Sequence, residues 1–255
     1  MELHLPRRGT PPAPHPSMTV QVDTQSLLAR RYALGRTLGS AGMGIVYEAT
    51  DVVTRQRVAV KVLKKVTVEN VRRLQREAEI GKAFANDYVR RVYDYGVERD
   101  SPYLVMELLE GEPLSARVRA SGGLAAGDAI AVGLQLLEAL DAAHAVGIMH
   151  RDVKPANVFV TSAPGKPLAT KLFDFGLARK IRPTPRDVEP SEDAPEEDTD
   201  TNITATGIVP GTPRYLTPEQ LSGARDLDAR VDVWAAALTL YEALAGKPAY
   251  RGSTD

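Results

Sequence analysis

IMHRDVKPANVFV, the stretch from Ile148 to Val160, places a His, an Arg, an Asp, a Lys and an Asn within eight residues, between two apolar runs. Burying such groups without partners would cost several kcal/mol each. A polar loop that satisfies its own hydrogen bonds would explain the pattern. However, LFDFGLA downstream supplies a second carboxylate, Asp174, so we favour a functional site.

The residue types in this stretch define a chemistry. Asp152 offers a proton acceptor, Lys154 a cation and Asn157 a carboxamide oxygen. A carboxylate and an amide oxygen that converge are hard ligands, which suit Mg²⁺ and not zinc. A base, a cation and a magnesium site together describe phosphoryl transfer.

The segment before this stretch predicts a small sheet with one helix. Residues 32–61 consist of short β-rich pieces separated by Gly and polar breaks, a pattern typical of an antiparallel meander. In VENVRRLQREAEIGKAF, which begins at Val68, apolar or small residues recur at helical spacing. Two further strand candidates, VRRVYDYGV and PYLVMELL, complete the predicted sheet.

Beyond Gly111 the sequence becomes helical. The segment AIAVGLQLLEALDAAHAVGI is long and apolar enough for a buried helix that ends near Gly147. A second such helix, VDVWAAALTLYEALAG, should end at Gly246. We therefore predict an α+β fold of two lobes, 32–110 with a small antiparallel sheet and one helix, and 111–255, mainly helical.

Two other segments read as disordered. Residues 1–31 form a Pro-rich tail, and an acidic insert of about 182–203 interrupts the second lobe. The net charge of −1 gives no global field to attract nucleic acid or anionic lipid. There is no cysteine, and we find neither a secretory signal nor an apolar run of membrane-spanning length. A cytoplasmic protein without a nucleic-acid or membrane partner is the expectation.

The segment LGSAGMGIVYEA, from Leu38 to Ala49, carries three glycines beside a strand. Glycines allow backbone N–H groups to approach a phosphate, although a Gly-rich hairpin turn would look the same. A strand follows and not a helix, which argues against a dinucleotide-binding unit, and no G-x-x-x-x-G-K-[ST] is present.

Lys61 ends the apolar strand segment VAVK. A lysine there could simply extend to water, or it could hold phosphate oxygens if an acid fixed its position. Glu77 and Glu79 on the following helix are both candidates for that acid, and spacing alone does not choose between them.

Six motifs in this order resemble the eukaryotic-type protein kinase family, and most closely the bacterial serine/threonine kinases. They are LGSAGMGIVY, VAVK, HRDVKPANV, DFG, GTPRYLTPEQ and DVWAAALTLYE. The resemblance covers about Tyr32 to Arg251, and DVKPAN is typical of the serine/threonine branch. It implies ATP-dependent phosphorylation of Ser or Thr hydroxyls on a protein substrate, with ATP and Mg²⁺ as cofactors.

The resemblance also implies a role for each candidate residue. The catalytic residues would be Asp152, Lys154, Lys61 and Glu77. Of the two candidate acids, Glu77 matches the family's helix glutamate better than Glu79 does. Asn157 and Asp174 would ligate Mg²⁺. The nucleotide would contact Leu38, Gly39, Ser40, Ala41, Gly42, Met43, Gly44, Val46, Ala59, Lys61, Met106, Glu107, Leu109 and Phe159. Arg151 would recognise a phosphorylated activation segment, and we hypothesise that Thr204 and Thr206 are the modified residues.

Several positions depart from the family pattern. Ala41 replaces the second glycine of the loop, and Gly81 stands where a larger apolar residue often packs, which we expect to loosen the helix from the sheet. The sequence stops soon after the helix containing Trp234, so the second lobe should lack its last helices and expose apolar surface. The alternative to an active kinase is therefore an impaired nucleotide-binding scaffold. Such a scaffold would need dimerisation or a partner chain to complete the lobe.

Overall fold

The structure, a computed structural model, describes residues 27–41, 44–83, 85–162, 165, 168–181, 212–224 and 226–250. Most of the predicted Pro-rich tail, the acidic insert, Gly42, Met43, Thr204 and Thr206 lie outside these residues. Residues 27–31, which the sequence assigned to the tail, contact the first lobe, because Leu28 forms a β-bridge with Tyr32.

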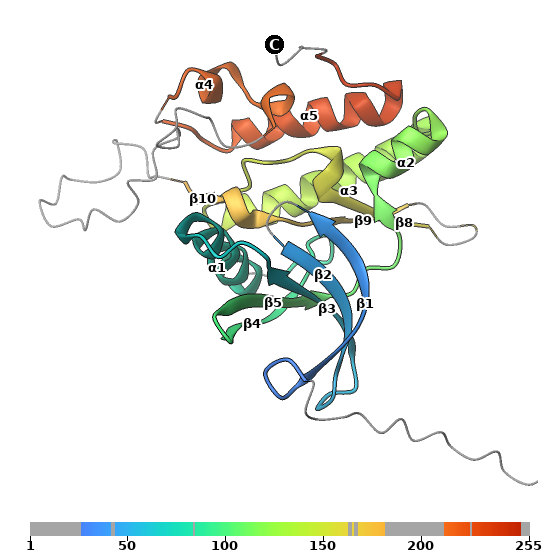
Figure 1. The fold of residues 1–255 in the computed structure, drawn as a ribbon. Helices are drawn as coiled ribbons and strands as arrows, with labels where there is room; N and C mark the ends of the chain where they lie inside the picture. The colour runs from blue at the N-terminus through green and yellow to red at the C-terminus, as the bar shows by residue number, and fades with distance from the viewer. Residues whose placement is uncertain are drawn as a thin grey trace, which may run out of the picture.

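The first lobe is a five-stranded antiparallel sheet with one helix (Figure 1). Its strands follow the order β1-β2-β3-β5-β4, so the first three form the predicted meander. The elements are β1 (Tyr32–Ala41), β2 (Gly44–Asp51), β3 (Arg57–Leu63), α1 (Val68–Ala83), β4 (Val92–Glu98) and β5 (Ser101–Glu107).

Strand alternation gives this sheet two apolar faces. Val58, Val60 and Val105 pack on one face around Tyr32 and Tyr103. The opposite face, which packs against α1, holds a cluster formed by Ala59, Leu63, Leu74, Ala78, Leu104 and Met106. Since Lys61 lies between Ala59 and Leu63 in β3, its side chain belongs to the face that contacts α1.

The second lobe is mainly helical and stacks beyond the sheet in Figure 1. Its helices are α2 (Leu114–Ser121), α3 (Ala126–Ala145), α4 (Pro218–Leu221) and α5 (Arg230–Ala245). Its strands are β6 (Glu112–Pro113), β7 (Ile148–Met149), β8 (Val158–Thr161), β9 (Ala169–Leu172) and β10 (Arg179–Lys180). Its described residues also contain the short 3₁₀ helices η2 (Pro155–Asn157), η3 (Phe175–Leu177) and η4 (Pro213–Tyr215).

The predicted α+β fold of two lobes is confirmed, and so is the end of α5. Gly246 caps this helix with a φ of 69°, in the left-handed region that glycine tolerates, and its N–H donates to the Glu242 carbonyl. An added Cβ at Gly246 would lie 2.1 Å from the Gly122 carbonyl oxygen, so this turn packs closely against the end of α2.

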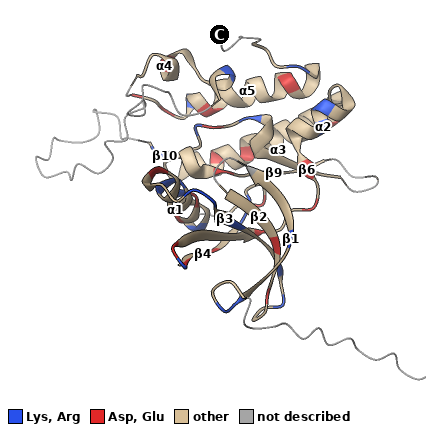
Figure 2. Ribbon diagram, in the orientation of Figure 1, with Lys and Arg blue, Asp and Glu red and all other residues tan. Residues whose placement is uncertain are grey.

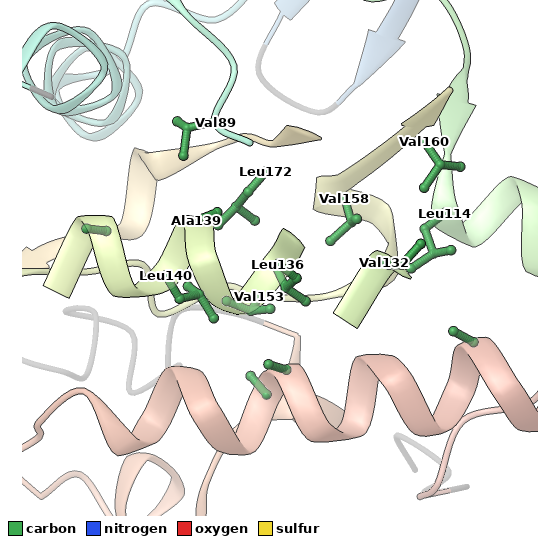
Figure 3. Close-up of a cluster of buried hydrophobic side chains, with 14 of the residues drawn as sticks. Val89, Leu114, Val132, Leu136, Ala139, Leu140, Val153, Val158, Val160 and Leu172 are labelled. Carbon is green, nitrogen blue, oxygen red and sulfur yellow. The ribbon is translucent and has the colours of Figure 1, made fainter. Parts of the chain in front are cut away.

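The core of the second lobe lies between α3 and the β8–β9 hairpin. Figure 3 shows Ala139 of α3 on the side of the helix near Leu172, whereas Leu136 and Leu140 lie on the side nearer α5. Ala235, Ala236 and Ala243 of α5 join the same cluster. The two long predicted helices therefore pack together and support the hairpin that leads to Asp174.

Both long helices also carry exposed apolar side chains, as expected. Ile130, Leu134 and Leu137 of α3 are exposed, and so are Val233, Trp234, Tyr241 and Leu244 of α5. Basic and acidic residues are interspersed along the ribbon of both lobes (Figure 2). Within the described ranges, none of the helices has the length and apolar character needed to cross a membrane.

The expectation that Gly81 loosens α1 from the sheet is wrong. A Cβ built on Gly81 would lie 2.3 Å from Cγ2 of Val92, so the Val92 side chain already occupies the space beside the glycine. The missing side chain brings helix and sheet closer together.

Candidate active site

The backbone around Asp152 is held by one buried carboxylate. Asp232, at the start of α5, is fully buried and accepts hydrogen bonds from the backbone N–H groups of His150 (2.8 Å) and Arg151 (2.7 Å). The His144 ring also bonds Asp232, at 2.8 Å. These bonds fix Arg151 at a φ of 65°, a left-handed conformation that a non-glycine residue keeps only when its surroundings hold it.

Asp152 stands at the centre of a side-chain network. Its two oxygens accept hydrogen bonds from Lys154 Nζ at 2.9 and 2.7 Å, and Oδ2 also accepts from Asn157 Nδ2 at 2.9 Å. Lys154 Nζ donates in addition to Thr212 Oγ1 at 3.1 Å. The polar residues of the opening stretch therefore converge on one carboxylate, and Lys154 links it to the segment that precedes α4.

The two residues predicted to ligate Mg²⁺ lie on adjoining backbone segments, since the Phe173 N–H donates to the Asn157 carbonyl at 3.1 Å. The Asn157 amide nitrogen is committed to Asp152, so its side-chain oxygen Oδ1 is the atom that suits a cation. Asp174 has a φ of 68°, in the left-handed region, and its side chain is half-buried. A carboxylate and an amide oxygen form a donor set that fits Mg²⁺.

Lys61 and Glu77 form a buried ion pair of 2.8 Å between Nζ and Oε2. Glu77 is buried on the sheet-facing side of α1, whereas Glu79 is exposed, so Glu77 is the partner that spacing alone could not identify. Burial by itself would lower the pKa of Lys61, but the nearby charges of Glu77 and Asp174 outweigh it and the pKa is raised. Lys61 is therefore cationic at neutral pH.

Asp174 is influenced by the same charges. Burial would raise its pKa, but Lys61 and other nearby cations outweigh burial, and the net pKa is lowered. Asp174 is thus ionised at neutral pH, as a metal ligand must be. Lys61 and Asp174 come from different lobes, and the charge of each shifts the pKa of the other towards its ionised form.

The apolar residues predicted to contact the nucleotide come from both lobes. Ala59 and Met106 pair across β3 and β5 and are buried, whereas Val46 in β2 is half-buried. Phe159 of β8, also half-buried, comes from the second lobe.

The segment after β5 is partly committed to the fold. The Glu107 N–H donates to the Arg91 carbonyl at 2.9 Å, so a ligand could not use that donor. Leu109, two residues further along, is half-buried.

The glycine-rich segment is described only in part. Leu38, Gly39 and Ser40 of β1 are exposed, and Ser40 Oγ accepts a hydrogen bond from Lys64 at 2.8 Å. At Gly44 an added Cβ would lie 2.5 Å from the Val62 carbonyl oxygen, so this position needs glycine for packing against β3. Ala41 belongs to β1, and Gly42 and Met43 lie outside the described residues.

Sequence reasoning missed two residues of this region. Asp232 lies inside the motif DVWAAALTLYE, where an acidic residue at the start of an apolar helix could have indicated a buried carboxylate with partners. Arg90 contacts Glu77, and no sequence signal distinguishes it from the exposed Arg91 beside it.

Residues 32–255 match the protein kinase domain family, and the chain belongs to this family. It is 36% identical over 235 residues to the probable serine/threonine-protein kinase CE0033 of Corynebacterium efficiens, which covers 89% of the chain and 33% of that protein. It is also 36% identical over 240 residues to Pkn1 of Myxococcus xanthus, covering 91% of the chain and 32% of the relative. With PknA of Mycobacterium tuberculosis it shares 36% identity over 233 residues, covering 88% of the chain and 49% of that protein. The chain thus spans between about a third and a half of the length of these curated serine/threonine-protein kinases.

Proposed function

We propose that the protein is a serine/threonine protein kinase that transfers the γ-phosphate of Mg-ATP to hydroxyl groups of a protein substrate in the cytoplasm. Family membership and the printed names of the relatives support this proposal. The observation that carries it is the convergence on Asp152. A buried carboxylate held by Lys154 and Asn157, in a chain that also supplies Asp174 and the Lys61–Glu77 pair, suits phosphoryl transfer.

Asp152 would accept the proton of the substrate hydroxyl as its oxygen attacks phosphorus. Lys154, already bonded to Asp152, would hold an oxygen of the transferring phosphoryl group. Lys61 would bind the other phosphates while Glu77 keeps its ammonium in place. Positioning and charge neutralisation supply most of the rate in this type of reaction.

The cofactors have matching residues. Asn157 and Asp174 would hold Mg²⁺, which when bound neutralises charge on the phosphate oxygens. The adenine ring would lie between Val46 and Ala59 on one side and Phe159 on the other. The remaining nucleotide contacts would come from Leu38, Gly39, Ser40, Ala41, Gly42, Met43, Gly44, Met106, Glu107 and Leu109.

A phosphate-transfer assay tests the proposal. Wild-type protein incubated with radiolabelled ATP and Mg²⁺ should label a general protein substrate on Ser or Thr. Asp152→Asn should lose roughly 10² to 10⁴ of the rate, the range typical of a general base. The exposed Asp87→Asn should leave the rate unchanged, since its side chain is 88% exposed.

The same assay, together with a measurement of Mg-ATP binding, separates the kinase from the alternative function. If wild type and Asp152→Asn both bind Mg-ATP and neither transfers phosphate, the kinase proposal is contradicted and a nucleotide-binding scaffold is supported. Size-exclusion chromatography would test the further prediction that a second copy or a partner chain covers the exposed apolar residues of α3 and α5.

A further inference from the structure

Arg90 lies on the connection between α1 and β4, at the junction of the two lobes. Its backbone N–H donates to the Leu172 carbonyl at 3.0 Å, and the Leu172 N–H donates to the Tyr88 carbonyl at 2.7 Å. This segment is thereby tied to the end of β9, immediately before Phe173 and Asp174. The Arg90 side chain is only 12% exposed.

The guanidinium group of Arg90 contacts both lobes. Nη2 donates to Glu77 Oε1 at 2.7 Å, and the guanidinium carbon lies 4.8 Å from the centre of the Phe173 ring. A cation over an aromatic ring is an attractive contact, more so when it is buried. One side chain therefore links the carboxylate of α1 to the residue that precedes Asp174.

The two oxygens of Glu77 are divided between two cations. Oε2 pairs with Lys61 at 2.8 Å and Oε1 with Arg90 at 2.7 Å, while the Glu77 side chain is 3% exposed. The three side chains therefore carry a net charge of about +1 instead of the zero of an isolated Lys61–Glu77 pair. Lys61 is left with positive charge that Glu77 does not cancel.

We propose that Arg90 is a positioning residue for the nucleotide site, which holds the second oxygen of Glu77 so that Lys61 can turn its charge towards the nucleotide phosphates. This inference rests on the proposed function, because it concerns the same phosphate-binding lysine. Without Arg90, Lys61 would be the one remaining ion-pair partner of Glu77 among the described residues. Glu77 would then compete with the phosphates for the N–H groups of the Lys61 ammonium.

The test measures Mg-ATP binding directly, by calorimetry, beside the steady-state rate. Arg90→Met removes the charge and keeps most of the length of the side chain. It should weaken Mg-ATP binding roughly tenfold, within the range seen for coupled contacts. KM should rise by the same factor while kcat changes by less than about threefold. Arg90→Lys should recover part of the affinity. Arg72→Met, on the exposed side of α1, is the matched control and should bind as wild type.

A second comparison separates positioning from a purely structural contact. In a Glu77→Gln background the carboxylate charge is absent, so Arg90→Met should weaken binding by less than about twofold. A tenfold loss that persists in this background would overturn the inference, as would an unchanged affinity in Arg90→Met alone. A lower melting temperature with unchanged affinity would also overturn it, because that result describes a structural clamp.

The two proposals fail separately. If wild type binds Mg-ATP and transfers no phosphate, the kinase proposal fails while the affinity of Arg90→Met still tests the role of Arg90. If wild type transfers phosphate and Arg90→Met binds Mg-ATP as wild type, the Arg90 inference alone fails.

Discussion

Asp232 shows how one residue far along the chain controls the geometry of Asp152. The catalytic candidate lies on a loop, and the loop backbone is bonded through His150 and Arg151 to a carboxylate some 80 residues later. Loss of a buried carboxylate that accepts several N–H bonds should lower the free energy of unfolding strongly, because buried donors are then left without partners.

Asp232→Asn tests this coupling. The variant replaces one acceptor oxygen with a donor that faces backbone N–H groups, so it should lower the free energy of unfolding by about 2–4 kcal/mol. It should also lower kcat by a larger factor than it changes KM, since Asp152 loses its fixed position. Urea unfolding and steady-state kinetics measure the two effects. The exposed pair of Asp228 with Arg230 provides the control, and Asp228→Asn should change neither quantity appreciably.

Asp51 gives a second prediction, on pH dependence. The pKa of Asp51 is lowered, and the largest cause is its hydrogen bonds from Arg31. Burial alone would raise this pKa, but it is outweighed. A carboxylate whose folded pKa is depressed stabilises the fold above its unfolded pKa of about 3.9, and this contribution is lost as the pH falls through the folded pKa.

Asp51→Asn should therefore lower the melting temperature at pH 7 by roughly 2–4 °C, and the gap from wild type should narrow by pH 3. Thermal unfolding at both pH values checks this. Asp87→Asn serves as the control. A gap of equal size at the two pH values would mean that ionisation of Asp51 contributes nothing.

Residue types could be predicted from the sequence, but their partners often could not. Asp152, Lys154 and Asn157 are close together in the chain, so their contact follows from local spacing. The choice of Glu77 over Glu79 needed the helix orientation, and Arg90 needed the approach of the α1–β4 connection to β9. Contacts between distant segments depend on packing, which a local pattern does not contain.

At the scale of elements, the long periodic segments and the β8–β9 hairpin were predicted, and the two-residue strands were not. Helices α1, α3 and α5 carry enough turns for their apolar spacing to be read. Strands β7 and β10 have two residues each and exist because they pair with each other across the chain. A two-residue strand has no period, so only the tertiary structure reveals it.

The contact of α1 with β4 yields a prediction at this scale. Gly81→Ala should gain helix propensity of about 1 kcal/mol, but the new methyl group would overlap the stiff Val92 side chain at a cost of about 1–3 kcal/mol. We expect a net loss of roughly 1 kcal/mol in unfolding free energy.

Combining Gly81→Ala with Val92→Ala should restore part of that loss, with a coupling of about 1 kcal/mol between the two positions. Chemical denaturation of the four proteins in the cycle measures the coupling. Gly127→Ala, in α3 with open space around the added methyl, is the control and should not destabilise. Strict additivity of the two changes would show that α1 and β4 do not compete for this space.

At the scale of the whole molecule, the two lobes supply different halves of the site. Lys61 and Glu77 belong to the sheet and helix of the first lobe, whereas Asp152, Asn157 and Asp174 belong to the second. A ligand that contacts both halves joins the lobes as well as occupying the site. The first lobe alone should bind such a ligand weakly, because the residues proposed to hold Mg²⁺ belong to the second lobe.

Mg-ATP should therefore raise the melting temperature of the whole chain. A ligand at a hundred times its Kd stabilises by about 2.7 kcal/mol, which corresponds to roughly 5–10 °C for a chain of this size. Lys61→Met should lose most of this shift because it removes a phosphate contact from the first lobe, while the exposed Lys65→Met should keep it. Asp174→Asn should give a similar small shift with Mg²⁺ or with a chelator, since the metal is then poorly held from the second lobe.

Thermal scans of the four proteins with ATP, with and without Mg²⁺, measure these shifts. A full shift in Lys61→Met, or one that depends on Mg²⁺ in Asp174→Asn as strongly as in wild type, would mean that the nucleotide binds elsewhere.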